Sequence, residues 1–220
     1  MRLLFSLPYW VYFILSAFAV LLAYQMYTFQ AKDIAERAEA LKVGPPAIVE
    51  LADFNKAEHA GPADEVFVRA QLDTSMSYEL TLTKKGTVKR RAHMLPLYPV
   101  GATSTEEPPA ALLFDESDEL DEDALFAVMV DVGEVGPIIE LNGLLVHAGK
   151  LNKNITGAFE EQNRAYKSGV PLIDPFLGLR TETLSEEKLA AVDMLYLFGG
   201  VALFLLIIGL YKMRRRKARA

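Results

Sequence analysis

The chain has 220 residues, of which 51% are hydrophobic and 24% charged, and its formal net charge is −6 at pH 7. It contains no cysteine, which excludes disulfide bonds, thiolate metal sites and cysteine nucleophiles. Once about 50 residues are assigned to apolar segments at the two ends, roughly 150 remain, enough for one cooperative core and too few for two domains of ordinary size.

The first predicted element is a membrane-spanning helix within residues 1–30. Leu3–Met26 carries no charged side chain, and about 20 apolar residues suffice to cross the hydrocarbon core. A cleaved signal peptide is the main alternative. Its apolar region would be shorter, and it would be followed by a small-residue cleavage site that Tyr24–Gln30 does not offer. We therefore expect a retained anchor.

The same helix is expected to continue as a stalk over residues 31–46. Its apolar residues recur at helical spacing, which predicts one alanine-rich stripe that packs the stalk. The stripe consists of Ala31, Ile34, Ala35, Ala38 and Leu41. Val43–Pro46 should end the helix, with Gly44 as the cap, because proline cannot continue it.

Alternating apolar and polar residues predict short strands over the middle of the chain. The predicted strands are Ala47–Ala52, Glu65–Leu72, Ser77–Thr83, Thr87–Leu95, Ala124–Val132 and Ile138–His147. Lys84–Gly86 is a turn signal that makes a hairpin of the third and fourth. The pattern predicts an α+β membrane protein whose domain at residues 47–182 is a small sheet or a partly closed barrel. Edge strands of such a domain are natural docking sites for partners.

Residues 101–123 interrupt the strands and are expected to form a solvated loop. The run Asp115–Asp123 has seven carboxylates in nine positions, and such a run repels itself. It lacks the central glycine and the terminal glutamate of a calcium-binding loop, so it does not predict a metal site.

Helical elements are predicted near the end of the chain. A short helix is expected at Phe159–Lys167, followed by an extended segment at Pro171–Arg180. Thr183–Glu186 fits a capping box, which predicts that a helix begins at Thr183 and runs through residues 183–211 into a second span at Met194–Tyr211. Neither span contains an ionisable residue, which argues against an ion or proton pathway.

Both spans have small residues on which helices can approach closely. They are Ala19, Ala23, Gly199, Gly200 and Ala202. These residues would either pair the two spans with each other or dock them on a larger complex.

The tail at residues 212–220 decides the predicted topology. It carries six basic side chains, which stay cytoplasmic because their translocation is costly: Lys212, Arg214, Arg215, Arg216, Lys217 and Arg219. Two spans then leave both chain ends in the cytoplasm. The overall character of the chain indicates a bacterial inner membrane, with the middle domain in the periplasm. Besides this anchoring role, the tail could bind anionic lipid or acidic loops of a partner.

The middle domain is strongly acidic. All 29 acidic residues and 16 of the 23 basic ones lie between Ala31 and Asp193, which gives a net charge of −13. Nucleic acid is excluded as a partner because it needs a basic footprint. A basic protein, such as a cytochrome or a cationic loop, is compatible.

The only basic concentration in the domain flanks the predicted hairpin turn. It consists of Lys84, Lys85, Lys89, Arg90 and Arg91. Two interpretations are open. The group is either an interaction patch for an acidic partner or lipid headgroups, or a charged hairpin face that balances the acidic loop.

The sequence shows no catalytic or phosphate-binding motif. His59, His93 and His147 are far apart, so a metal site would require the fold to assemble three separate segments. We therefore expect no cofactor and no enzymatic activity.

Short segments recur along the chain in a familiar order, from Tyr24-Gln25 through Pro45-Pro46 to Leu141–Leu145. In this order they resemble the Surfeit-locus family of cytochrome oxidase assembly factors. Tyr24-Gln25, the stalk and Pro45-Pro46 are similar to that family's passage from the first span to its entry strand. Its later strands resemble Val66–Leu72, Pro96–Pro99 and Leu141–Leu145. Tyr24 stands where the family has tryptophan, and the arginine-glycine-tryptophan motif is absent, because Trp10 is the only tryptophan. The resemblance covers the layout of most of the chain, implies an assembly or accessory role, and transfers no functional residue.

The sequence thus predicts a non-catalytic accessory subunit or assembly factor of a larger membrane protein complex, a class that includes respiratory complexes. Two alternatives stay open. One is a small-ligand or lipid-binding module with its pocket inside the β-domain. The other is a membrane-surface enzyme, in which His59, His93 and His147 or some carboxylates would meet in one cleft.

Overall fold

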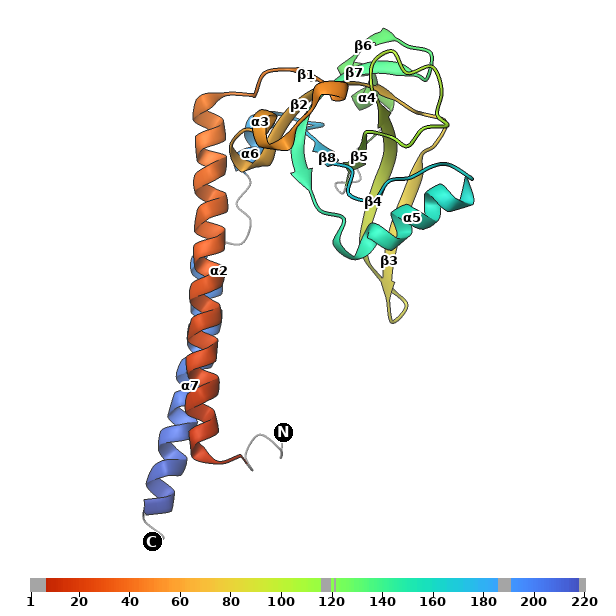
Figure 1. Cartoon of the computed structure of the whole chain (residues 1–220). Coiled ribbons are helices and arrows are strands. Elements are labelled where there is room, and N and C mark those ends of the chain that lie inside the picture. Colours follow the sequence, from red (N-terminus) through yellow and green to blue (C-terminus); the bar gives the residue numbers. More distant parts are fainter. Residues whose placement is uncertain (1–6, 116–119, 121, 186–190, 218–220) are drawn as a thin grey trace. The chain divides into compact units, whose positions relative to one another are not determined.

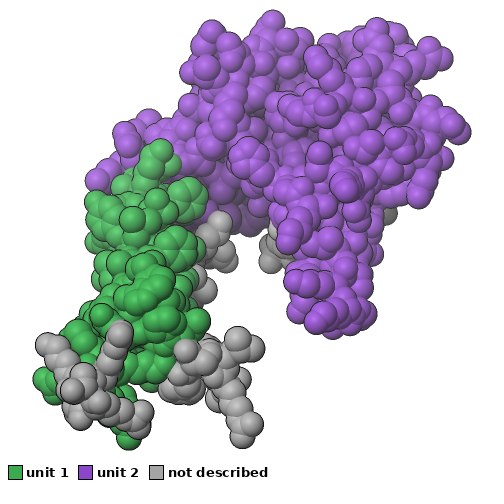
Figure 2. Space-filling model, turned by 60° about the horizontal axis from the view of Figure 1, so that its bottom comes forward, with its two compact units in different colours: residues 1–36, 186–220 green, residues 37–185 purple. Residues whose placement is uncertain are grey.

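The computed structural model describes residues 7–115, 120, 122–185 and 191–217. It is an α+β structure with a mixed β-sheet and a long apolar helix towards each end of the chain. The chain forms two compact units, described separately below (Figure 2). The first contains residues 1–36 and 186–220, and the second contains residues 37–185.

Two long helices form the first unit (Figure 1). Helix α2 covers Tyr9–Val43 and α7 covers Ala191–Lys217. Both are long and apolar enough to cross a membrane, α7 over Leu195–Arg215. The prediction that the first apolar segment continues into the stalk without a break is confirmed. The helix ends at Gly44, whose φ of +88° and N–H bond to the carbonyl of Ala40 (3.0 Å) are those of a left-handed cap.

The predicted alanine-rich stripe of the stalk is wrong. Ile34 and Leu41 are 51% and 36% exposed, whereas Arg37 and Ala40 are buried. Arg37 and Ala40 continue the alternating three- and four-residue spacing of the buried positions upstream, which is the spacing of a helix–helix seam. Alanine is compatible with either face, so the neighbouring elements decide which face is covered.

The predicted capping box is also wrong. Thr183 lies inside helix α6, Arg180–Ser185, which begins three residues earlier. The continuation predicted over residues 186–190 lies outside the described residues, as do residues 1–6 of the first predicted span.

Among its described residues, the second unit contains the strands, four short α-helices and the last residues of α2, 37–43. The strands are β1 (Val49–Glu50), β2 (Glu65–Leu72), β3 (Tyr78–Lys84), β4 (Thr87–Tyr98), β5 (Ala111–Asp115), β6 (Met129–Val132), β7 (Pro137–Val146) and β8 (Leu172–Pro175). The helices are α3 (Lys56–His59), α4 (Glu122–Val128), α5 (Asn152–Glu161) and α6, and short 3-10 turns lie at Leu51–Asp53, Pro62–Asp64 and Gly149–Leu151.

Five of these strands close into a barrel. The sheet order is β1-β2-β4-β5-β8-β7-β6, and an additional antiparallel pairing of β2 with β7 joins the two sides into the ring β2-β4-β5-β8-β7. Strands β2, β4 and β5 are antiparallel neighbours, and β7 returns to lie antiparallel beside β2. Strand β8 completes the ring by pairing parallel to β5. The predicted small sheet or partly closed barrel is therefore a closed ring with β1, β3 and β6 attached to it.

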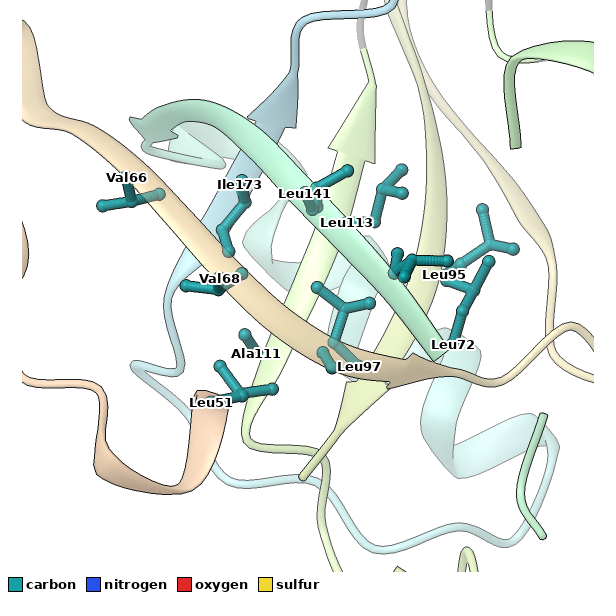
Figure 3. Close-up of a cluster of buried hydrophobic side chains, with 12 residues drawn as sticks. Leu51, Val66, Val68, Leu72, Leu95, Leu97, Ala111, Leu113, Leu141 and Ile173 are labelled. Atoms are coloured by element: carbon teal, nitrogen blue, oxygen red, sulfur yellow. The ribbon is translucent and has the colours of Figure 1, made fainter. Parts of the chain in front are cut away.

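The barrel interior is packed with aliphatic side chains (Figure 3). The predicted alternation of β2 is confirmed, because Val66, Val68, Ala70 and Leu72 are all fully buried. They meet inward-facing residues of the neighbouring strands, among them Leu95, Leu97, Leu113, Leu141 and Ile173. A second cluster lies where α5 covers β3 and β4, and it includes Met94, Phe114, Ile155 and Phe159.

Other predicted elements also differ from the structure. Only Val49–Glu50 of the predicted strand Ala47–Ala52 is a strand, because a 3-10 turn follows at Leu51–Asp53. Strand β5 lies within the segment predicted as a loop, and all five of its residues are buried. The first half of the predicted strand Ala124–Val132 is helix α4, whose Leu125 and Val128 pack on the core one turn apart. The helix predicted at Phe159–Lys167 is α5, which begins and ends earlier. A short apolar run fits both the helical and the strand periodicity, and tertiary contacts decide which structure it forms.

Candidate interaction surfaces

The small residues predicted to mediate helix contacts line a narrow seam between α2 and α7. Ala19, Ala23 and Ala202 are 7%, 2% and 3% exposed. Ser16 is also buried, and its Oγ donates a hydrogen bond of 2.8 Å to the carbonyl of Ala202. A Cβ on Gly209 would lie 3.2 Å from the Cβ of Tyr12, so glycine permits the close approach there. Of the two predicted roles for small residues, Ala19, Ala23 and Ala202 therefore have the first, which is to pair the two helices with each other.

The other two predicted contact residues, Gly199 and Gly200, are not in this seam. A Cβ added to either would meet no described atom within 4 Å. The larger apolar side chains of both helices are also exposed in this unit. Phe18 and Leu21 on α2 are 58% and 53% exposed, and Phe204 on α7 is 62% exposed. Pairing therefore covers little of the apolar surface of the two helices.

One basic residue of the tail takes part in the helix pair. Lys212 donates from Nζ to the carbonyl of Leu7 at 2.8 Å, and Nζ lies 4.9 Å from the ring centre of Tyr12. Arg214 is exposed, and the guanidinium of Arg215 stacks on Tyr211 at 5.1 Å. Arg216 and Lys217 lie in the last turn of α7, and Arg219 is outside the described residues.

The basic group on the β3–β4 hairpin is divided between two faces of the strand. The turn itself is as predicted, with positive φ at Lys85 and Gly86. Lys84, Lys85, Lys89 and Arg91 are exposed, and Arg91 lies 3.6 Å from Glu79.

Arg90 does not belong to the exposed basic patch. It donates to the carbonyls of Ala148 (2.9 Å) and His147 (3.3 Å), and its guanidinium lies 5.9 Å from the ring centre of Phe114. Neighbouring strand residues point to opposite faces, so Arg90 stabilises the loop after β7.

The three histidines lie on different elements. His59 ends α3, where its Nδ1 accepts a hydrogen bond from the backbone N–H of Asn55 at 3.0 Å. His93 lies on β4, in register with Asp115 of β5, and His147 follows β7. Within the described residues, no group of three or more histidines and carboxylates could hold a metal ion.

A buried ion pair ties the end of helix α2 to the barrel. Glu65 is fully buried and accepts two hydrogen bonds from Arg180, at 2.6 and 2.7 Å. These bonds raise the pKa of Arg180 above its usual range. Arg180 also donates to the carbonyl of Ala40 (2.8 Å), and Arg37 donates to the carbonyl of Thr183 (3.1 Å). Two arginines thus satisfy backbone carbonyls at helix ends, where a cation is favoured.

A second buried carboxylate, Asp73, pairs with Arg164. Asp73 is 1% exposed and also accepts hydrogen bonds from the backbone N–H and the hydroxyl of Ser75, at 2.9 and 2.6 Å. Burial raises the pKa of nearby Tyr98, while the Coulombic effect of Arg164 lowers it. The carboxylate is satisfied by these partners, which fits a structural role in the loop after β2.

Two of the hollows on the described surface of the second unit differ in character. The larger is a cleft of about 600 Å³ whose lining includes Lys56, His147, Asn152 and Tyr166. Burial raises the pKa of Tyr166, whose ring stacks on Phe159.

The smaller hollow is a groove of about 280 Å³, lined by Leu72, Thr74, Leu125, Phe126, Met129 and Pro137. The sequence prediction missed this groove, because Ala124–Val132 was predicted to be one continuous strand. The spacing of the apolar Leu125 and Val128, directly after the acidic Asp123, would have been the signal for a helix.

These features describe a protein with two paired apolar helices and a β-barrel unit. Comparisons of the chain with protein-family models, curated proteins and solved structures found no match.

Proposed function

We propose that this protein is a non-catalytic accessory subunit or assembly factor of a larger membrane protein complex. The observation that carries this proposal is the helix pair. A seam of small residues joins α2 to α7, while Phe18, Leu21 and Phe204 stay more than half exposed. Such side chains suit lipid or the helices of another membrane protein. The layout resemblance to cytochrome oxidase assembly factors makes a respiratory complex the first candidate.

In this proposal α2 and α7 are the two membrane spans, and both chain ends lie in the cytoplasm. The basic tail supports this orientation. Because the chain has no cysteine, single cysteine variants can test it in intact cells. A membrane-impermeant maleimide should label Glu160→Cys in the barrel unit and leave Ala220→Cys unlabelled. The reverse pattern would contradict the topology.

Co-purification tests the function itself. The full-length protein, tagged at the C-terminus, is extracted from its native membranes in mild detergent, and the proteins that accompany it are identified by mass spectrometry. Stoichiometric subunits of one membrane complex are the expected result. A protein that purifies alone, with no change in the level of any complex after deletion of its gene, would contradict the proposal.

A small-ligand module is the second candidate, supported by the 600 Å³ cleft. Aliphatic side chains fill the barrel interior, so a ligand would bind in this surface cleft instead. A thermal-shift screen of lipids and metabolites tests the idea. A stabilising compound should lose its effect in Tyr166→Ala and keep it in Tyr78→Ala, because Tyr78 does not line this cleft. If the screen finds no compound that stabilises the protein, that result would count against a small-ligand module.

A further inference from the structure

A cluster of exposed apolar side chains lies on α4 and β6, which Figure 1 shows at one end of the barrel. The cluster, called the α4–β6 patch below, consists of Phe126, Met129, Val130 and Val132, which are 64%, 38%, 49% and 74% exposed. Phe126 and Met129 also line the 280 Å³ groove, whose floor includes the fully buried Leu72. Exposed apolar groups gathered around a groove mark an interaction site more often than scattered ones do.

The size of the groove favours a side chain of a protein over a small molecule. Sites for small molecules usually have volumes of about 300–1,000 Å³, and this groove lies just below that range. It can hold one large apolar side chain. Anchoring of such a side chain in a pocket is how a few residues dominate protein–protein affinity.

The backbone of β6 is not arranged to accept another strand. Among the described residues β6 pairs only with β7, over four residues, and the register slips between Met129 and Asp131. The Asp131 carboxylate accepts a hydrogen bond from the backbone N–H of Val132 at 2.8 Å. Short length, a bulge and a charged residue are features that protect an edge strand from pairing. Contact through side chains in the groove is therefore favoured over addition of a strand.

The charge around the patch selects the kind of partner. The 58 residues from Ala92 to Gly149 contain 12 carboxylates and no lysine or arginine. Among them Asp123, Asp131 and Glu134 are exposed within or next to the elements of the patch. The acidic stretch includes both α4 and β6, so the groove lies in the most negative part of the sequence.

One buried side chain joins two acidic segments of the chain. Gln71 donates to the carbonyls of Pro99 and Ala102, both at 3.0 Å, and accepts from the N–H of Val135 at 3.3 Å. It thereby joins the loop that continues to Glu106 and Glu107 to the turn that carries Glu134. An anionic bilayer, or a second copy of this chain that docks through the same face, would meet like charge here, whereas a basic segment would be attracted.

We propose that the groove beside α4 and β6 binds a basic, amphipathic segment of a partner protein. The segment places one large apolar side chain in the groove, and its lysines or arginines lie against the surrounding carboxylates. The inference deepens the proposed accessory function, on which it rests, by naming the site and the chemistry of the partner.

The test uses the full-length protein in nanodiscs of zwitterionic lipid. The probe is a fluorescein-labelled peptide of alternating leucine and lysine, and its binding is measured by fluorescence anisotropy. Peptides that alternate serine with lysine, or leucine with glutamate, are the controls. The leucine–lysine peptide should bind, and more weakly as salt increases. Equal binding of the serine–lysine peptide would overturn the proposal, because charge alone would then explain the affinity.

Variants locate the binding. Phe126→Ser should weaken the leucine–lysine peptide about tenfold, the size of an anchor residue's contribution. Val88→Ser is its matched control, since Val88 is 42% exposed on the basic hairpin, and it should leave affinity unchanged. Asp131→Asn with Glu134→Gln should weaken binding and flatten its salt dependence, whereas Asp53→Asn with Glu160→Gln should not. Equal effects of variant and control would overturn the proposal.

Two further outcomes separate this inference from the proposed function. Co-purification that succeeds equally well with wild type and Phe126→Ser would overturn the docking site and leave the accessory function intact. A wild-type protein that purifies alone would contradict the function, whatever the peptide result. A homodimer cross-linked through Phe126→Cys, the only cysteine in that variant, would assign the patch to a second copy and overturn the basic partner.

Discussion

Different kinds of side chain are buried within the helix pair and within the barrel. Between α2 and α7 the buried residues are mostly small or polar, such as Ser16, Ala23 and Ala202. Inside the barrel the buried residues are mostly large aliphatic ones, such as Leu97, Leu113 and Leu141. Both units are rich in apolar side chains, but only the barrel buries most of its own.

The difference follows from the solvent proposed for each unit. In water, each Å² of buried apolar surface stabilises a fold by about 25 cal/mol, so a barrel is stable if it buries leucine and valine. In lipid this driving force is absent, and helices associate through close packing of small residues and through hydrogen bonds. The two sets of buried residues are thus what the proposed placement, with α2 and α7 in a membrane and the barrel in water, would require.

The largest expected effect is on the barrel unit, at its buried ion pair. Glu65→Ala leaves Arg180 without its carboxylate, and breaking a buried pair typically lowers the free energy of unfolding by about 3–5 kcal/mol. Chemical denaturation followed by circular dichroism measures the change. Glu140→Ala on neighbouring β7, where the glutamate is only partly buried, should change stability by less than about 1 kcal/mol. Equal losses in both variants would show that the Arg180–Glu65 pair has no special role.

The next effect tests the aliphatic core directly. Leu113→Ala leaves a cavity in the barrel interior, which should lower the free energy of unfolding by about 2–5 kcal/mol. Val88→Ala, at an exposed position on β4, is the control and should change it by less than about 0.5 kcal/mol. Trp10 lies in α2 and is the only tryptophan, so its fluorescence should be the same in both variants. A small loss in Leu113→Ala would mean that the barrel interior is less tightly packed than its fully buried side chains indicate.

A steric change addresses the seam between the helices. Gly209→Leu would place side-chain atoms against Tyr12 and Phe13, and overpacking of this kind costs about 1–3 kcal/mol. Cross-linking in a Ser16→Cys, Ala202→Cys background measures the pairing, and its yield should fall. Gly200→Leu, where a Cβ meets no described atom within 4 Å, should leave the yield unchanged. A lower yield in Gly200→Leu alone would indicate a different helix interface.

The smallest effect is expected for a single hydrogen bond in the seam. Ser16→Ala removes the bond to the carbonyl of Ala202, and such bonds between membrane helices contribute about 0.6 kcal/mol on average. Fluorescence of Trp10 during denaturation in mixed micelles reports on the helical unit alone. Thr28→Ala is the control, because its hydroxyl bonds within its own helix, to the carbonyl of Gln25. A loss of several kcal/mol in Ser16→Ala would mean that the seam depends on polar contacts far more than proposed.

The amino-acid sequence by itself determined the features that depend on local pattern. Three local patterns are each compatible with only one structure, because period, charge and glycine conformation agree. They are the two apolar runs without charge, the cap at Gly44 and the strict alternation along Glu65–Leu72. The β3–β4 hairpin is of the same kind, since its lysine–glycine turn fits the positive φ values that a tight hairpin needs.

Tertiary structure decided everything that depends on a neighbour. The run Ala124–Val132 fits a strand or a helix, and only the packing of Leu125 and Val128 on the barrel core makes its first half helical. Arg90 appears as one of five basic hairpin residues, but the loop after β7 supplies the carbonyls that draw it inward. The closing pair of β2 with β7 and the groove beside α4 join residues more than fifty positions apart, which no local pattern specifies.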